Sequence, residues 1–235
     1  MIGRYVAALT AVIVVATPEA GAQTSRADPT DLQGWIGASL RLDLPKRWAA
    51  SLQYRLRMVD DIGTYRGSYF TPEVARGFGS HFKVMAGYRL ALVDEGRFHR
   101  LAVGAEVDGK VGKVGAGFRS MLQYQRQNFA GNDEQSSDDD ALLRTRFEAK
   151  LPVAKGVVLH GSSEPFFKFE GGYLVDNWRN TLGVKLEYAK NQKVDVFYIY
   201  RPDYAKSYNR AFHVIGLELE FEVKPLKGKK RKEAR

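Results

Sequence analysis

The chain has 235 residues and a formal net charge of +9, and its length suits a single domain. It contains no cysteine, which excludes disulfides and thiolate chemistry. Its mean hydropathy of -0.35 resembles that of soluble proteins, but this value does not exclude a membrane β-barrel, because half of each barrel strand faces a polar lumen.

Residues 1–22 have the pattern of a secretory signal peptide. One positive charge, Arg4, precedes an apolar run over residues 5–16, and Ala20-Gly21-Ala22 offers small residues to a signal peptidase. A membrane-anchoring helix is the weaker interpretation, because a spanning helix needs ~20 apolar residues. We therefore expect cleavage before Gln23 and export by the Sec route. Since no later segment is apolar over a spanning length, only a closed barrel could place this chain in a membrane.

The remaining chain alternates apolar and polar residues with a period of two, which predicts strands with two unlike faces. In residues 47–58, for example, Leu52 and Tyr54 share one parity, whereas Gln53 and Arg55 share the other. No helical pattern separates the strands, so we predict an all-β, antiparallel up-and-down barrel. The predicted strands are residues 35–44, 47–58, 81–92, 113–127, 142–151, 178–188, 194–200 and 213–223, with weaker patterns at 66–76, 97–108 and 157–170.

The connections alternate between short and long, a pattern typical of outer-membrane barrels with short periplasmic turns and longer extracellular loops. Because single-chain bacterial barrels have an even number of strands, we expect ten to twelve strands, with twelve favoured. The barrel domain should extend over residues 23–223. The short connections are 45–47, 77–80, 109–112, 152–156 and 190–192, and the longer ones are 59–65, 93–96, 128–140, 171–176 and 204–209.

The aromatic residues bear on which face of the strands lies inside. Trp178 and Tyr188 share a parity and lie ten residues apart, which is ~34 Å of strand. A tilt of ~40° reduces this to ~26 Å along the barrel axis, close to the ~25 Å apolar band between aromatic girdles. With Trp48, which begins its apolar face, these residues form the predicted girdle, although Trp35 falls on a polar parity. We therefore favour an apolar face toward lipid over a soluble barrel such as a lipocalin.

The opposite parity carries charges of both signs, which a lumen tolerates when they pair across the barrel. We expect these charges to close much of the lumen, because a barrel of this size lies between side-chain-filled and open barrels. The predicted lumen-lining charges are Arg55, Arg57, Arg144, Arg146, Glu148, Lys150, Lys185, Glu187, Glu218 and Glu220.

Several strand motifs resemble the domain of unknown function 2490 family over residues 33 to 223. They are RTRFEAKLP, SSEPFFKFEGG, NWRNTLGVKLEY, VFYIY and the closing HVIGLELEF. The resemblance implies an outer-membrane-like β-barrel. It implies no activity, because the family has no agreed catalytic residues to transfer.

The last strand resembles an outer-membrane assembly signal, with Gly216 followed by Leu217, Leu219 and Phe221. It departs from the usual pattern because the basic tail 224–235 follows it, with seven Lys/Arg and one Glu. A solvated, disordered tail is the preferred interpretation. The expected partners are outer-membrane lipids, lipopolysaccharide, the barrel-assembly machinery and an anionic periplasmic partner of the tail, but not nucleic acid.

The sharpest candidate for chemistry is His160, Ser162 and Glu164, which share one strand face. A His-x-Ser pair is similar to the arrangement in outer-membrane lipid A deacylases, where an acid orients the histidine that activates the serine. However, residues two apart on a strand are separated by ~7 Å, and this parity faces the lumen. Polar lumen residues are therefore the preferred interpretation, and a lipid A or phospholipid acyl hydrolase is the alternative.

The sequence predicts no cofactor and no metal site. The other three histidines have no metal-ligand spacing, and the acidic residues within 128–140 lack the alternating positions of a calcium loop. We therefore expect a non-enzymatic outer-membrane β-barrel, either structural or a narrow pore with a charged lumen.

Overall fold

The computed structural model describes residues 30–94, 96–127, 140–169, 174–203 and 210–224. The predicted signal peptide, most of the long acidic loop and nearly all of the basic tail lie outside these residues. Within them there is no helix long and apolar enough to cross a membrane.

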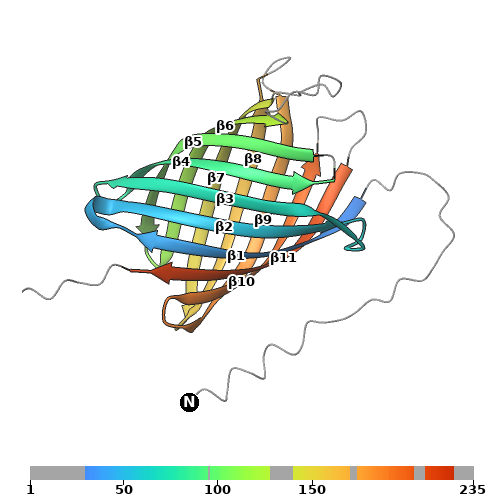
Figure 1. Ribbon diagram of the computed structural model, residues 1–235. Helices are drawn as coiled ribbons and strands as arrows, with labels where there is room; N and C mark the ends of the chain where they lie inside the picture. The colour runs from blue at the N-terminus through green and yellow to red at the C-terminus, as the bar shows by residue number, and fades with distance from the viewer. Residues whose placement is uncertain (1–29, 95, 128–139, 170–173, 204–209, 225–235) are drawn as a thin grey trace, which may run out of the picture.

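Eleven strands form one closed barrel (Figure 1). Ten of them pair antiparallel with the next strand in the chain, and the short 3-10 turn η2 (Pro45–Arg47) connects β1 to β2. The strands are β1 Thr30–Asp43, β2 Trp48–Val59, β3 Thr64–Phe78, β4 Phe82–Val93, β5 Gly96–Val111, β6 Val114–Gln127, β7 Asp140–Ala154, β8 Val157–Lys168, β9 Leu174–Ala189, β10 Gln192–Asp203 and β11 Arg210–Val223.

The barrel closes with a parallel pair, and the expectation of twelve strands is wrong. β1 pairs with β11 in parallel from Thr30↔Ala211 to Leu42↔Val223. An odd number of up-and-down strands makes the first and last strands run the same way. Parallel ladders satisfy backbone donors and acceptors as antiparallel ones do, so closure does not require an even count.

The three strands with weaker sequence patterns are present as β3, β5 and β8, and each contains a residue that interrupts the alternation. These residues are Pro72 in β3, Gly104 in β5 and Pro165 in β8. A Cβ at Gly104 would lie 2.3 Å from the backbone oxygen of Ser120, so this position of β5 has no room for a side chain. The interruption at Gly104 therefore reflects local packing.

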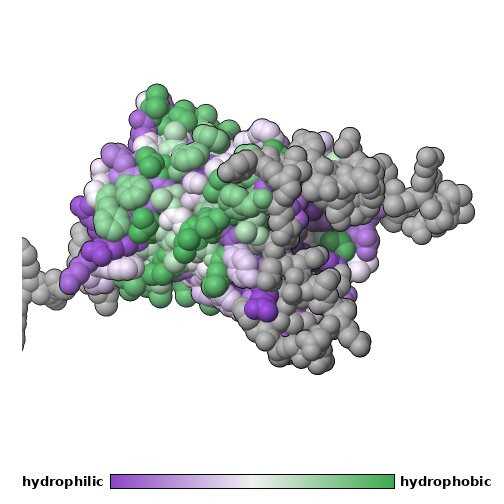
Figure 2. Space-filling view, turned by 90° about the horizontal axis from the view of Figure 1, so that it is seen from above, coloured by the Kyte–Doolittle hydropathy of each residue, from purple (hydrophilic) through white to green (hydrophobic). Residues whose placement is uncertain are grey.

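The apolar parity lies on the outside of the barrel. All eleven strands carry large apolar side chains exposed on this face, such as Leu52 at 49% and Leu182 at 70%. Figure 2 shows these residues gathered over the body of the barrel, with hydrophilic residues gathered toward the rim of short turns at the left. The arrangement inverts that of a soluble sheet, in which the apolar face packs inward.

The connections separate into two rims. Short turns join β1 to β2, β3 to β4, β5 to β6, β7 to β8 and β9 to β10 at one rim, here called the short-turn rim. The other connections, which include the two longest, lie at the opposite rim, here called the loop rim. Because the strand number is odd, β1 starts at the loop rim and β11 ends at the short-turn rim (Figure 1).

Gly216 of β11 makes room for an aromatic ring inside the barrel. A Cβ at this position would lie 2.1 Å from ring atoms of Phe197 on the neighbouring strand β10, and the two residues are direct cross-strand partners. The glycine that resembled part of an assembly signal therefore also has a packing role, because only a residue without a side chain lets the Phe197 ring lie flat on the wall.

We expect Gly216→Ala to lower the free energy of unfolding by ~1–3 kcal/mol, the usual range for overpacking. The added methyl group must displace the Phe197 ring from its position. Urea unfolding of the refolded protein, followed by tryptophan fluorescence, measures the change. The double variant Gly216→Ala/Phe197→Leu should recover part of the loss, whereas an unchanged midpoint for the single variant would contradict this packing role.

Candidate functional site

An apolar cluster, here called the inner cluster, lies in the lumen near the loop rim. It consists of Trp35, Phe197, Ile199 and Val214, which are between 0% and 8% exposed. Trp35 lies five residues after the start of β1, which places the cluster in the half of the barrel nearer the loop rim. Trp35 shares the parity of the polar residues of β1 because its indole points into the lumen and occupies space there.

Arginine side chains lie against the inner cluster. The guanidinium carbons of Arg57, Arg55 and Arg179 lie 4.2, 5.0 and 5.5 Å from the Trp35 ring centroid. These distances are within the range of cation–π attraction. Trp35 therefore connects the inner cluster to the arginines of the lumen wall. The cluster and these arginines both narrow the lumen.

Beside the inner cluster the lumen holds a cavity of about 630 Å³. Its lining extends from Trp35, Phe197 and Ile199 of the inner cluster to residues close to the short turns, such as Arg41 and Glu222, so the cavity runs through both halves of the barrel. The described residues that line it include eleven Lys/Arg and seven Asp/Glu. The cavity wall is therefore net positive.

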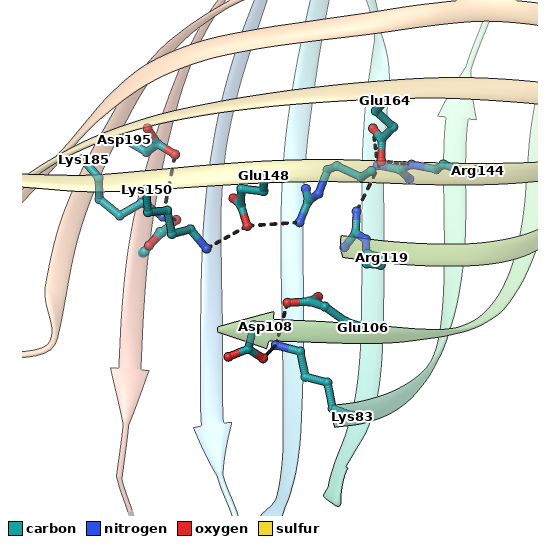
Figure 3. A network of polar contacts seen from close by, with 12 residues as sticks. Lys83, Glu106, Asp108, Arg119, Arg144, Glu148, Lys150, Glu164, Lys185 and Asp195 are labelled. Carbon is teal, nitrogen blue, oxygen red and sulfur yellow. Dashed lines mark hydrogen bonds and ion pairs between the residues drawn. The ribbon is translucent and has the colours of Figure 1, made fainter. Parts of the chain in front are cut away.

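Glu164 of β8 is the centre of the strongest charge cluster. It is 2% exposed, and its carboxylate accepts two hydrogen bonds from Arg144, at 2.5 and 2.9 Å. Arg119 and Arg179 lie 3.5 and 3.6 Å away. Figure 3 shows Arg119 and Arg144 converging on Glu164 from neighbouring strands. One carboxylate thus holds three guanidinium groups from β6, β7 and β9.

Further ion pairs cross the wall toward the short-turn rim (Figure 3). Glu148 lies 2.8 Å from Lys150 and 3.9 Å from Arg146. On the neighbouring wall, Lys185 lies 2.6 Å from Glu220 and 3.8 Å from Asp195. These pairs link strands β9, β10 and β11 through their side chains in addition to their backbone ladders.

Another ion pair bridges the parallel closure. Arg55 of β2 donates to Glu218 of β11 at 2.6 Å, and Gln53 donates to the other carboxylate oxygen at 2.7 Å. Strand β1 lies between these two strands. These side chains therefore link β2 to β11 across β1, in addition to the parallel backbone ladder between β1 and β11.

The structure brings most of the predicted lumen charges to the cavity, but not all. Arg57 lies above the cavity between the rings of Trp35 and Tyr69, at 4.2 and 4.1 Å. Glu187 is exposed at the short-turn rim, next to a register shift that leaves Tyr188 of β9 without a partner residue on β10. The predicted residues that line the cavity are Arg55, Arg144, Arg146, Glu148, Lys150, Lys185, Glu218 and Glu220.

Sequence reasoning missed several cavity residues. Arg89, Arg100, Arg119 and Arg179 line the cavity and lie on the polar parity of their strands. The parity alone could have found them. It could not have shown that they converge, because that depends on strand register and barrel closure.

The predicted girdle residues all lie on the outer face, at two levels. Trp48 and Tyr188 lie near the short-turn rim and are 39% and 53% exposed. Trp178 lies near the loop rim and is 38% exposed; its indole N–H donates to Ser163 at 2.7 Å. The outer face thus has aromatic side chains toward both of its ends.

The Ser162–His160–Glu164 arrangement that the alternative hypothesis requires is not formed. The Nε2 atom of His160 lies 2.7 Å from Asp195 of β10, while Glu164 is held by arginines. Ser162 lines the cavity, but among the described residues its hydroxyl makes no hydrogen bond with His160. The acyl-hydrolase hypothesis therefore lacks its predicted geometry.

Metal binding has little support in the described part of the chain, where no group of three or more His, Asp or Glu residues is placed to hold an ion. Most of the acidic loop lies outside this part, so its interpretation as a surface without a calcium site stays a prediction.

Comparison with known proteins identifies a family. A family model described as "Protein of unknown function (DUF2490)" matches residues 32–211, which confirms the resemblance of the strand motifs. No curated protein matches the chain. The solved structure described as "NanC porin structure in rhombohedral crystal form" has a TM-score of 0.49 and 13% identity, covering 72% of this chain and 86% of that chain.

Proposed function

We propose that this chain, which belongs to the DUF2490 family of proteins of unknown function, is an outer-membrane β-barrel of a Gram-negative bacterium without catalytic activity. Its lumen is a narrow, charged space, closed toward the loop rim. The protein acts either as a structural barrel or as a pore of low conductance.

The observation that carries this proposal is the inverted distribution of side chains. Soluble monomers rarely expose contiguous apolar patches above a few hundred Å², yet large apolar side chains are exposed on all eleven strands here. Lipid tails would cover this surface. A closed barrel also satisfies the backbone groups of its strands within itself, which the hydrocarbon interior demands.

The ends of the barrel support an orientation. Outer-membrane barrels have short periplasmic turns and longer outer loops, so the short-turn rim would face the periplasm. The aromatic residues near both rims match the girdles of such barrels. In this orientation the cavity residues close to the short turns lie toward the periplasm, and the inner cluster narrows the passage toward the cell exterior.

The lumen supports a low conductance. Six of the seven carboxylates that line the cavity form ion pairs with basic side chains, so the acidic groups of the wall are largely neutralised. The side chains of the inner cluster also take up space in the half nearer the loop rim. Ions therefore face both a dehydrating apolar segment and a paired, crowded wall.

Membrane fractionation combined with gel mobility tests the proposal. We expect the protein in the outer-membrane fraction, and we expect it to migrate faster unboiled than boiled, because a folded barrel resists the detergent of the gel. A soluble periplasmic protein whose mobility does not depend on boiling would overturn the membrane assignment. The matched control is a variant with Leu182→Asp and Leu217→Asp on the outer face, which should fail to insert.

A further inference from the structure

Two arginines face each other directly on the inner wall of the barrel. Arg89 of β4 and Arg100 of β5 are cross-strand partners, and both line the cavity. Like charges directly opposite each other in a sheet are destabilising. Arg100 donates to the side chain of Gln125 at 3.0 Å.

In a second arginine pair on the same wall, nearby carboxylates offset such repulsion. Arg119 of β6 and Arg146 of β7 are also direct partners. Each of them has a carboxylate within 4 Å, namely Glu164 at 3.5 Å from Arg119 and Glu148 at 3.9 Å from Arg146. This pair is therefore neutralised by the protein itself.

Arg89 has no such compensation. Its side chain donates to the hydroxyl of Thr71 at 3.2 Å, and no carboxylate of the described residues lies within ion-pair distance of it. Glu73 is on the adjacent strand but lies opposite Gly87 rather than Arg89. The strongest influences of other charges on Arg89 come from four arginines: Arg100, Arg57, Arg144 and Arg55.

We infer that Arg89 and Arg100 form a binding site for a small anionic solute that carries a phosphate or carboxylate group. Guanidinium groups bind such oxyanions through paired hydrogen bonds, and a bound anion would remove the repulsion between the two cations. The cavity of about 630 Å³ falls within the usual volume range of small-molecule sites.

The position of the site narrows the ligand class. Both arginines face the cavity and not the outer surface, so the ligand is a dissolved solute and not a headgroup in the surrounding bilayer. Hydroxyl and amide groups next to the site, from Thr71 and Gln123, offer hydrogen bonds to the rest of the solute. The inference deepens the proposed function and rests on it for the route by which the solute arrives.

Titration of pyrophosphate into the full chain, refolded in detergent micelles, tests the inference by calorimetry. Sodium chloride keeps the ionic strength constant, so that non-specific screening does not change. We expect saturable binding of about one pyrophosphate per barrel. Arg89→Gln should weaken the binding about tenfold or more, as expected for losing one charge-assisted hydrogen bond.

Thermal unfolding of the same samples gives a second measurement. Without pyrophosphate, Arg89→Gln should unfold at the same or a higher temperature than the parent, because it removes the like-charge repulsion. Pyrophosphate should raise the unfolding temperature of the parent, but it should not raise that of the variant. A purely structural arginine would produce the opposite result, a variant that is less stable under both conditions.

Arg97→Gln is the matched control, because Arg97 lies on the same strand as Arg100 but is exposed away from the cavity. It should bind pyrophosphate as the parent does. Equal binding by the parent and Arg89→Gln, or no binding by the folded parent, would overturn the inference. Both measurements use folded protein in micelles, so failure of the membrane assignment in cell fractions remains distinguishable from failure of this site.

Discussion

Glu164→Gln should lower the free energy of unfolding of the barrel by about 3–5 kcal/mol, the range for removing one partner of a buried ion pair. Three arginines lie within 4 Å of this carboxylate. The amide of glutamine is similar in size but neutral, so the substitution leaves the arginines crowded together without a counter-charge. The loss therefore reflects repulsion and not a cavity.

Urea unfolding of the parent and variant in detergent or liposomes measures this change. The control is Glu187→Gln, which removes the same charge from an exposed position at the short-turn rim and should change the stability by less than ~0.5 kcal/mol. A second variant, Glu164→Gln/Arg144→Gln, should recover part of the loss because it removes one of the uncompensated cations. Equal stabilities for Glu164→Gln and Glu187→Gln would contradict the central role of Glu164.

Trp35→Ala should produce the largest change in ion passage of any single substitution, together with a loss of about 3–5 kcal/mol in stability. Trp35 is 1% exposed and lies in the inner cluster near the loop rim. Its removal takes a large apolar ring out of the lumen. It also takes away the surface on which Arg55, Arg57 and Arg179 lie.

Planar-bilayer recordings test this change. The parent should show small or no conductance, and Trp35→Ala should show larger and more frequent openings, with a mild preference for anions because of the basic wall. Trp178→Ala is the control, since it removes the same side chain from the outer face and should leave the conductance unchanged. A large, cation-selective current through the parent protein would contradict the closed, paired lumen.

The barrel itself was largely predictable from local pattern. Alternation with a period of two specifies which side chains share a face, and it does so residue by residue along each strand. All eleven predicted strands are present, and the apolar positions in residues 47–58, such as Leu52, lie on the outer face as expected for a lipid-facing strand. Such patterns are local, so tertiary structure is not needed to recognise them.

The strand number and the site depended on contacts that no local pattern contains. The even-number rule led to twelve strands, whereas the chain closes through a parallel β1–β11 pair, because closure is decided by the ends of the whole sheet. In the same way, parity alone placed Glu164 beside His160 and Ser162 on one strand face. Only the register of neighbouring strands shows that arginines surround it.

The all-β class, the strand positions and the side of each strand that carries charge therefore follow from the covalent order of residues. Which charges meet depends on the tertiary structure. Arg89 faces Arg100, Trp35 fills the lumen and Asp195 contacts His160, although most of these residues lie far apart in the chain. Their distances depend on register, tilt and closure, which are set by the barrel as a whole.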